Sequence, residues 1–114
     1  MYNYKARVTN VVDGDTIDVL IDLGFFVTVS HRIRVASYDA PESTWRAKTE
    51  EERQLGLDAK KVATGLLLDH DITVLTHKDR EDIYARYSAD ITMSDGRDFA
   101  TVMKELGFIK QTVK

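Results

Sequence analysis

The sequence predicts an α+β protein that is mainly β, with five strands forming a barrel and two accompanying helices. The first third alternates apolar and polar residues with a period of two, as half-buried strands do. Two helical segments and two more alternating segments follow, and turn residues such as Asp13-Gly14 separate the strands. With 114 residues, the chain is expected to form one domain over residues 1–114.

Three strands are expected first. Residues 4–11 are β-prone and end at the Asp13-Gly14 turn. Residues 15–22 carry an apolar row made of Ile17, Val19 and Ile21. After a turn at Leu23-Gly24, residues 25–36 alternate again. Sequential strands with tight turns predict a meander.

A helix should follow Pro41. Thr49 and Glu52 have the spacing of a capping box, in which Thr49 is the N-cap and Glu52 reaches back. The helix should run to about Leu68, with an apolar face of Leu55, Ala59, Val62 and Leu66.

The last third should hold strands at 72–76 and 86–93, then a helix over 99–106. Asp98 is its expected cap and Gly107 its expected stop. Three strands, a helix, two strands and a helix predict an antiparallel five-stranded barrel of the OB type, with one helix between strands three and four and one at the C-terminus. OB barrels often bind oligonucleotides, but a fold alone does not assign a function.

The composition excludes several kinds of functional site. The chain has no cysteine, which excludes disulfides, thiolate metal sites and a cysteine nucleophile. Its net charge of −3 argues against a protein that grips nucleic acid by bulk electrostatics, so any such contact needs a local basic cluster. One candidate cluster is Arg32, Arg34, Arg46 and Lys48, with Arg86 elsewhere in the chain.

The N-terminus resembles no secretory signal, and no apolar run is long enough to span a bilayer. The expectation is a protein that is cytoplasmic as encoded, in an intracellular or phage-encoded role. A mature secreted form whose signal had been removed would look the same.

Three short segments carry candidate catalytic residues. Asp15 shares the core-facing parity of its strand, where a carboxylate needs a partner or a metal; the alternative is a simple turn residue. Arg34 precedes Asp39 and Glu42, which flank the stiffening Pro41; the alternative is a strand end with solvated charges. Arg86 follows 82–85 at a strand start, and its alternative is an exposed solubilising group.

Together these side chains make a set suited to phosphodiester hydrolysis. Asp15 and Asp39 can hold a hard divalent cation, which acts as a Lewis acid on a phosphate oxygen. Arg34 and Arg86 can clamp phosphate oxygens bidentately. Glu42 can orient or deprotonate water.

The ordered set of motifs resembles the staphylococcal nuclease (thermonuclease) family over nearly the whole chain. The resemblance is carried by 11–16, by Arg34 five residues before 39–42, by Gly56 and Ala59, by 82–86 and by 106–107.

The resemblance implies an OB-type barrel and a calcium-dependent endonuclease that cuts DNA and RNA to leave 3′-phosphate ends. It implies one calcium ion, with other divalent cations as alternatives, bound by Asp15, Asp39 and the backbone carbonyl of Ala40. Glu42 would be the general base. Arg34 and Arg86 would bind the scissile phosphate, and Tyr84 would contact the nucleotide.

The sequence also departs from the family pattern. Ile83 and Ala85 replace a lysine and a glycine of the best-known member, and the chain stops at Lys114 where that member has a third helix.

The expected partner is a DNA or RNA substrate, with no membrane, and the expected state is a monomer. The alternatives are a non-catalytic OB module that binds nucleic acid or protein, and a calcium-binding interaction domain without turnover.

Overall fold

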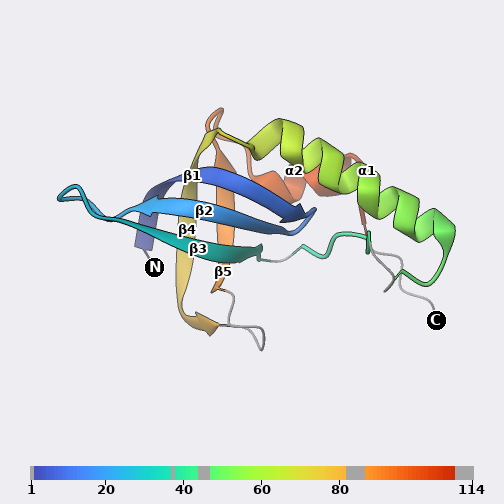
Figure 1. Ribbon diagram of the computed structural model, residues 1–114, viewed down its shortest axis with the longest axis horizontal. Helices are drawn as coiled ribbons and strands as arrows, with labels where there is room; N and C mark the ends of the chain where they lie inside the picture. Colours follow the sequence, from blue (N-terminus) through green and yellow to red (C-terminus); the bar gives the residue numbers. More distant parts are fainter. Residues whose placement is uncertain (1, 37, 44–46, 82–86, 110–114) are drawn as a thin grey trace.

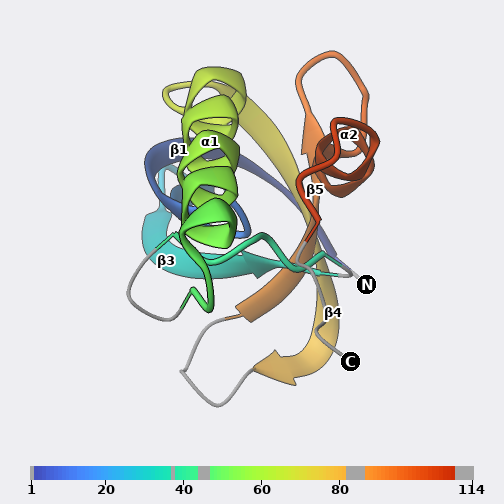
Figure 2. The ribbon, with the colours of Figure 1, turned by 90° about the vertical axis from the view of Figure 1, so that its right-hand side faces the viewer.

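The computed structural model describes residues 2–36, 38–43, 47–81 and 87–109. Five strands form a closed barrel in the order β1-β2-β3-β5-β4, and two helices lie against it (Figures 1 and 2). The chain order confirms the expected one. The elements are β1 (Tyr2–Asp13), β2 (Thr16–Asp22), β3 (Thr28–Val35), α1 (Glu50–Leu67), β4 (Asp71–Glu81), β5 (Tyr87–Met93) and α2 (Phe99–Glu105).

The expectation of a wholly antiparallel barrel is wrong, because β3 pairs with β5 in parallel. The other four pairings, β1–β2, β2–β3, β1–β4 and β4–β5, are antiparallel. In a closed ring with an odd number of strands, directions cannot alternate all the way round, so at least one pair must be parallel. The helix α1 carries the chain from β3 to β4, which lies beside β1 and leaves β5 to close the ring.

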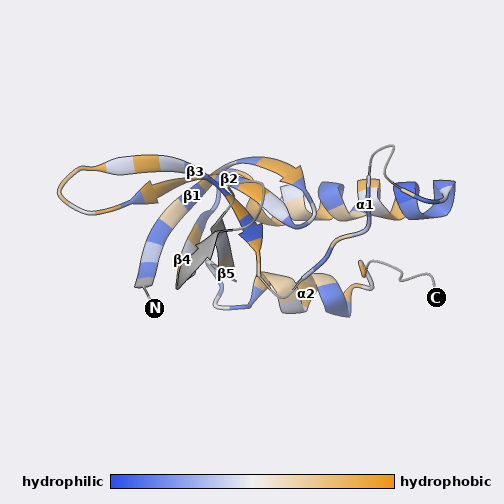
Figure 3. Ribbon diagram, turned by 90° about the horizontal axis from the view of Figure 1, so that it is seen from below, coloured by the Kyte–Doolittle hydropathy of each residue, from blue (hydrophilic) through white to orange (hydrophobic). Residues whose placement is uncertain are grey.

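The barrel interior is filled by the alternating apolar rows of the strands. Val8, Ile17, Val19, Val74 and Ile91 are fully buried, as period-two patterning predicts. Figure 3 shows this alternation as bands along the strands. The row predicted over residues 15–22, which is Ile17, Val19 and Ile21, therefore lies in the core.

The helix α1 begins as expected, but a different stripe faces the barrel. The Thr49 hydroxyl accepts a hydrogen bond from Glu52 N, so Thr49 is the N-cap. The Glu52 carboxylate accepts from Lys48 N at 2.9 Å, one residue before the expected capping-box partner. The buried residues of α1 are Glu52, Gly56, Ala59, Ala63 and Leu67. The small members of this stripe let the helix approach the barrel closely, whereas the predicted Leu55, Val62 and Leu66 are only half-buried.

Turn and capping residues determine where β3 begins and where α2 begins and ends. The third strand begins at Thr28 and not at residue 25, because Phe25 and Phe26 have positive φ angles of 53° and 61° and belong to the turn. Asp98 caps α2 through Thr101 N, as expected. Gly107, with φ of 87°, ends the helix.

Candidate functional site

Three of the predicted site residues, Asp15, Arg34 and Asp39, meet where β2 begins and β3 ends. Thr16 of β2 and Arg34 of β3 are partners in the antiparallel register. Asp15 in the preceding turn is joined to the end of β3, because Val35 N donates to the Asp15 carbonyl oxygen at 2.8 Å. Asp15 therefore lies beside Arg34, one residue before the register partner of that arginine.

One guanidinium nitrogen joins the two predicted cation ligands. Arg34 Nη2 lies 3.5 Å from Asp15 Oδ2 and also donates to Asp39 Oδ1. Asp15 and Arg34 are largely shielded, with side-chain exposures of 15% and 25%, while Asp39 is 67% exposed. The position between the two carboxylates is thus one that attracts positive charge and opens to solvent on the Asp39 side.

Asp15 is also held by its own surroundings. Its Oδ1 accepts from Thr16 Oγ1 at 3.0 Å, and its Oδ2 accepts from the Ala40 backbone N–H at 3.1 Å. These bonds fix the carboxylate and tie the segment that carries Asp39 to the β1–β2 turn. A carboxylate held in this way is positioned before any ligand arrives.

Close packing at two glycines fixes the segment 38–43 between the β1–β2 turn and α1. A Cβ atom at Gly56 of α1 would lie 2.3 Å from the Glu42 carbonyl oxygen and 2.7 Å from that of Pro41. A Cβ atom at Gly14 would lie 2.8 Å from Ala40 Cβ. The helix therefore meets the backbone of residues 41–42, and the turn meets the Ala40 side chain, at distances that only glycine allows.

Tyr38 anchors the same segment to the far end of the chain. Its side chain is buried, and its hydroxyl donates to the Phe108 carbonyl oxygen at 2.7 Å. Its ring meets Phe99 of α2 edge to face, with centroids 6.5 Å apart. Burial is the main cause that raises the pKa of Tyr38 above its ordinary value, and the charges of Asp15 and Asp13 add to it.

Asp13 belongs to the site although its sequence position suggested only a turn. Its Oδ1 accepts from Gly14 N at 2.9 Å and from Ser43 Oγ at 3.2 Å. Burial raises the pKa of Asp13, the charges on Asp15 and Glu42 raise it further, and the hydrogen bonds from Gly14 and Ser43 oppose the rise. The doubled acid of Asp13-Gly14-Asp15 was the only sequence signal, since Ser43 is 30 residues away.

The charge balance at this end of the barrel favours a cation. Among the residues that the structure describes, Asp13, Asp15, Asp39 and Glu42 gather at this end of the barrel, and Arg34 contacts two of these four carboxylates. Asp15 and Asp39 are the pair that could hold a hard divalent ion through oxygen. Across the described ranges, no group of three or more acidic or histidine side chains is arranged to hold a metal, so any such ion would also need backbone or water oxygens.

The predicted basic cluster does not come together among the described residues. Arg32 pairs with Asp18 across the β2–β3 ladder, with Nε 2.8 Å from Oδ1. Lys48 is exposed before α1. Arg46, Tyr84 and Arg86 lie outside the described residues.

No protein-family model matches the chain, and a search of the curated proteins finds no relative. In the part of the chain that the structure describes, neither helix has the length and apolar character needed to cross a membrane.

Proposed function

We propose that this protein is a cation-dependent endonuclease that hydrolyses the phosphodiester backbone of DNA or RNA. The observation that carries the proposal is the meeting of Asp15, Arg34 and Asp39 at one point of the barrel. An OB-like barrel is compatible with the five strands found here, and the resemblance to the staphylococcal nuclease family supplies the finer assignment.

The local negative charge supports a requirement for a cation. A phosphodiester carries negative charge, so it would be repelled by the excess of carboxylates around Arg34. Asp15 and Asp39 would hold a divalent ion, for which calcium is the proposed choice, with the Ala40 carbonyl as a third ligand. When bound, the ion supplies Lewis acidity toward a phosphate oxygen.

Each side chain at this end of the barrel then has its own role in the proposed hydrolysis. Glu42 accepts a proton from the attacking water, and the rigid packing of its backbone against Gly56 limits its movement. Arg34 donates to phosphate oxygens and stabilises the charge that develops on them. The same role for Arg86, and nucleotide contact by Tyr84, rest on the sequence resemblance. The products would carry 3′-phosphate ends.

The proposal is tested by incubating the purified protein with single-stranded DNA and with RNA, in calcium, in magnesium and in excess chelator. Cleavage is expected with calcium, with loss of nearly all activity in chelator and in Glu42→Gln. Near-wild-type cleavage by Glu42→Gln, or full activity in chelator, would refute the mechanism.

A non-catalytic binding module is the second candidate, because the net charge of −3 does not prevent local binding. Oligonucleotide binding without cleavage under any of these conditions would favour it. The intact set of acids and Arg34 is the feature that places the enzyme first.

A further inference from the structure

The segment that follows β3 is held by hydrogen bonds on both sides of Glu42, the proposed general base. Two residues before Glu42, the Ala40 N–H donates to Asp15 Oδ2 at 3.1 Å. One residue after it, the Ser43 hydroxyl donates to Asp13 Oδ1 at 3.2 Å. Both acceptors belong to the short connection between β1 and β2. This connection therefore restrains both ends of the stretch that contains Glu42.

The oxygen that accepts from Ser43 is itself fixed in place. Asp13 is the last residue of β1, and its Oδ1 also accepts from Gly14 N at 2.9 Å. Gly14 packs so closely that an added Cβ would lie 2.8 Å from Ala40 Cβ and 3.2 Å from Ala59 Cβ. Because the turn touches both the site segment and α1, Asp13 offers Ser43 an acceptor with a defined position.

Close packing restrains the same stretch from the opposite direction only. The Glu42 and Pro41 carbonyl oxygens would lie 2.3 Å and 2.7 Å from a Cβ atom added at Gly56 of α1. This contact prevents movement toward the helix. A hydrogen bond also resists movement away from it, because the bond weakens as its length and angle change. Glu42 and Ser43 are only half-buried, so the Ser43 bond adds a restraint that packing does not supply.

The charges around Glu42 make such a restraint useful. The charges of Asp15 and Glu42 both raise the pKa of Asp13, which means that the three carboxylates lie near one another. Like charges repel, so repulsion favours movement of Glu42 away from the turn. The Ser43 hydroxyl opposes that movement, since it ties the residue next to Glu42 to Asp13 itself.

We propose that Ser43 is a positioning residue for hydrolysis, whose hydroxyl, bound to Asp13, holds the backbone that carries Glu42 so that this carboxylate meets the attacking water. The inference rests on the proposed function and adds one residue to it. Ser43 acts through Glu42 and touches neither the substrate nor the cation. A shift of about 1 Å in a catalytic group can cost about 100-fold in rate, so the loss of this single hydroxyl should be measurable.

The test is steady-state cleavage of single-stranded DNA by the full chain in calcium, with folding checked by circular dichroism. Ser43→Ala should lower kcat by about 10- to 100-fold through misplacement of Glu42. KM and the calcium dissociation constant, the latter measured by titration calorimetry, should stay within about threefold of wild type, as for a residue that acts only in the chemical step. Ser43→Thr keeps the hydroxyl donor and should keep kcat within about threefold.

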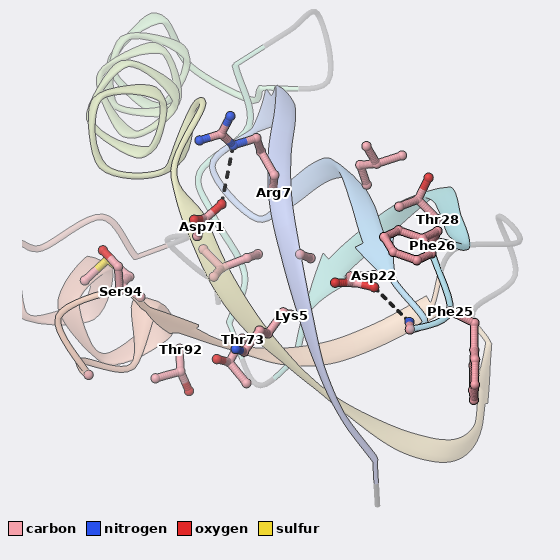
Figure 4. Close-up of a pocket in the computed structure, with 16 residues that line it drawn as sticks. Lys5, Arg7, Asp22, Phe25, Phe26, Thr28, Asp71, Thr73, Thr92 and Ser94 are labelled. Carbon is pink, nitrogen blue, oxygen red and sulfur yellow. Dashed lines mark hydrogen bonds and ion pairs between the residues drawn. The ribbon is translucent and has the colours of Figure 1, made fainter.

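Ser94→Ala is the matched control, because it makes the same substitution at an exposed serine. Ser94 lines a groove that none of the described site residues lines (Figure 4). The variant should therefore cleave like wild type.

A double variant shows whether Ser43 acts through Glu42. The base is absent in Glu42→Gln, so adding Ser43→Ala should lower the residual kcat by less than about threefold. A combined variant that loses the full factor seen for Ser43→Ala alone would show that Ser43 acts on another group, and the proposal would be wrong.

The outcomes separate this proposal from the proposed function. Wild-type kcat in Ser43→Ala would overturn the role of Ser43 and leave the nuclease function in place. So would equal losses in Ser43→Ala and Ser43→Thr, or a loss that appears in KM or in calcium affinity and not in kcat. No cleavage by the wild type under any condition would reject the proposed function, and the role of Ser43 with it.

Discussion

Arg32 and Arg34 lie two residues apart on β3, yet their guanidinium groups have different surroundings. Arg32 is 53% exposed and pairs with the single carboxylate of Asp18. Arg34 is 25% exposed and contacts both Asp15 and Asp39. The sequence grouped both arginines in one basic cluster, because alternation gives them the same strand face. Asp18 lies opposite Arg32 in the register, whereas the two carboxylates that Arg34 contacts come from the β1–β2 turn and from the segment after β3.

The residues of the site differ in how far the sequence could predict them. Asp15, Arg34 and Asp39 follow from parity, strand position and the rigid segment around Pro41, and the structure brings them together. Asp13 and Tyr38 could not be assigned, because their partners Ser43 and Phe108 lie 30 and 70 residues away. Local patterns identify a side chain that faces the barrel end, but not its hydrogen-bond partner from a distant segment.

Tyr38→Phe is predicted to lower stability at neutral pH by about 0.5–1.5 kcal/mol, through loss of the bond to Phe108. It should also change the pH dependence. Burial raises the pKa of Tyr38, so the folded state holds this proton more tightly than the unfolded state, whose pKa is near 10.0. The resulting stability is fully present below pH 10 and is lost as pH rises above it.

Urea unfolding of wild type and Tyr38→Phe, at neutral pH and at several values above pH 10, checks this prediction. The wild type should lose stability more steeply on the alkaline side than the variant. Parallel pH profiles would show that Tyr38 does not contribute in this way.

At the scale of elements, the contact of α1 with the site segment depends on small residues. The sequence correctly indicated the helix, its Thr49 cap and the buried Ala59, but it also placed Leu55, Val62 and Leu66 on the apolar face, where they are only half-buried. The observed stripe also contains Gly56 and Ala63, two small residues that the predicted face did not include. Hydrophobic periodicity identifies the large side chains that enter a core. It does not identify a helix face of small residues that allows the backbone of another segment to come close.

Gly56→Ala is predicted to destabilise the protein by about 1–3 kcal/mol, as overpacking does, although alanine favours a helix. The added Cβ would meet the Glu42 and Pro41 backbone at less than 3 Å, so the site segment must shift. Gly65→Ala in the same helix is the matched control, because nothing lies within 4 Å of a Cβ there. It should stabilise by about 0.5–1 kcal/mol.

Thermal and urea unfolding of the two variants measure these opposite signs. Gly56→Ala should also reduce nuclease activity by more than its stability loss explains, because Glu42 moves. Equal effects of the two substitutions would contradict the account of how α1 positions the segment.

For the whole molecule, the element order and the barrel could be predicted from the sequence, but the parallel pair that closes the barrel could not. The pattern of strands and helices follows from periodicity and turn residues, and the structure reproduces it. The parallel β3–β5 pair joins residues that are more than 50 positions apart, such as Ile33 and Tyr87, and no local pattern encodes it. The closure matters for function because it completes the barrel next to Arg34, whose register partner in β5 is Ser88.

Calcium is predicted to stabilise the whole fold, since Asp15 and Asp39 would bind it only when the barrel brings them together. At a calcium concentration 100 times its dissociation constant, the gain is about 2.7 kcal/mol. Asp15→Asn should lose this gain. Asp18→Asn should keep it, because Asp18 pairs with Arg32 away from the site. Scanning calorimetry with calcium and with chelator tests the prediction, and a calcium effect equal in both variants would exclude Asp15 as a ligand.

The most direct test of the central claim is cleavage of single-stranded DNA by Arg34→Ala beside Arg32→Ala, with calcium present and folding confirmed by circular dichroism. The two substitutions remove the same charge from the same strand. If Arg34 stabilises the reacting phosphate, its loss should lower kcat/KM by about 100- to 1,000-fold, while Arg32→Ala should stay within about threefold of wild type. Comparable rates for the two variants, or near-wild-type cleavage by Arg34→Ala, would contradict the assignment of this site to phosphodiester hydrolysis.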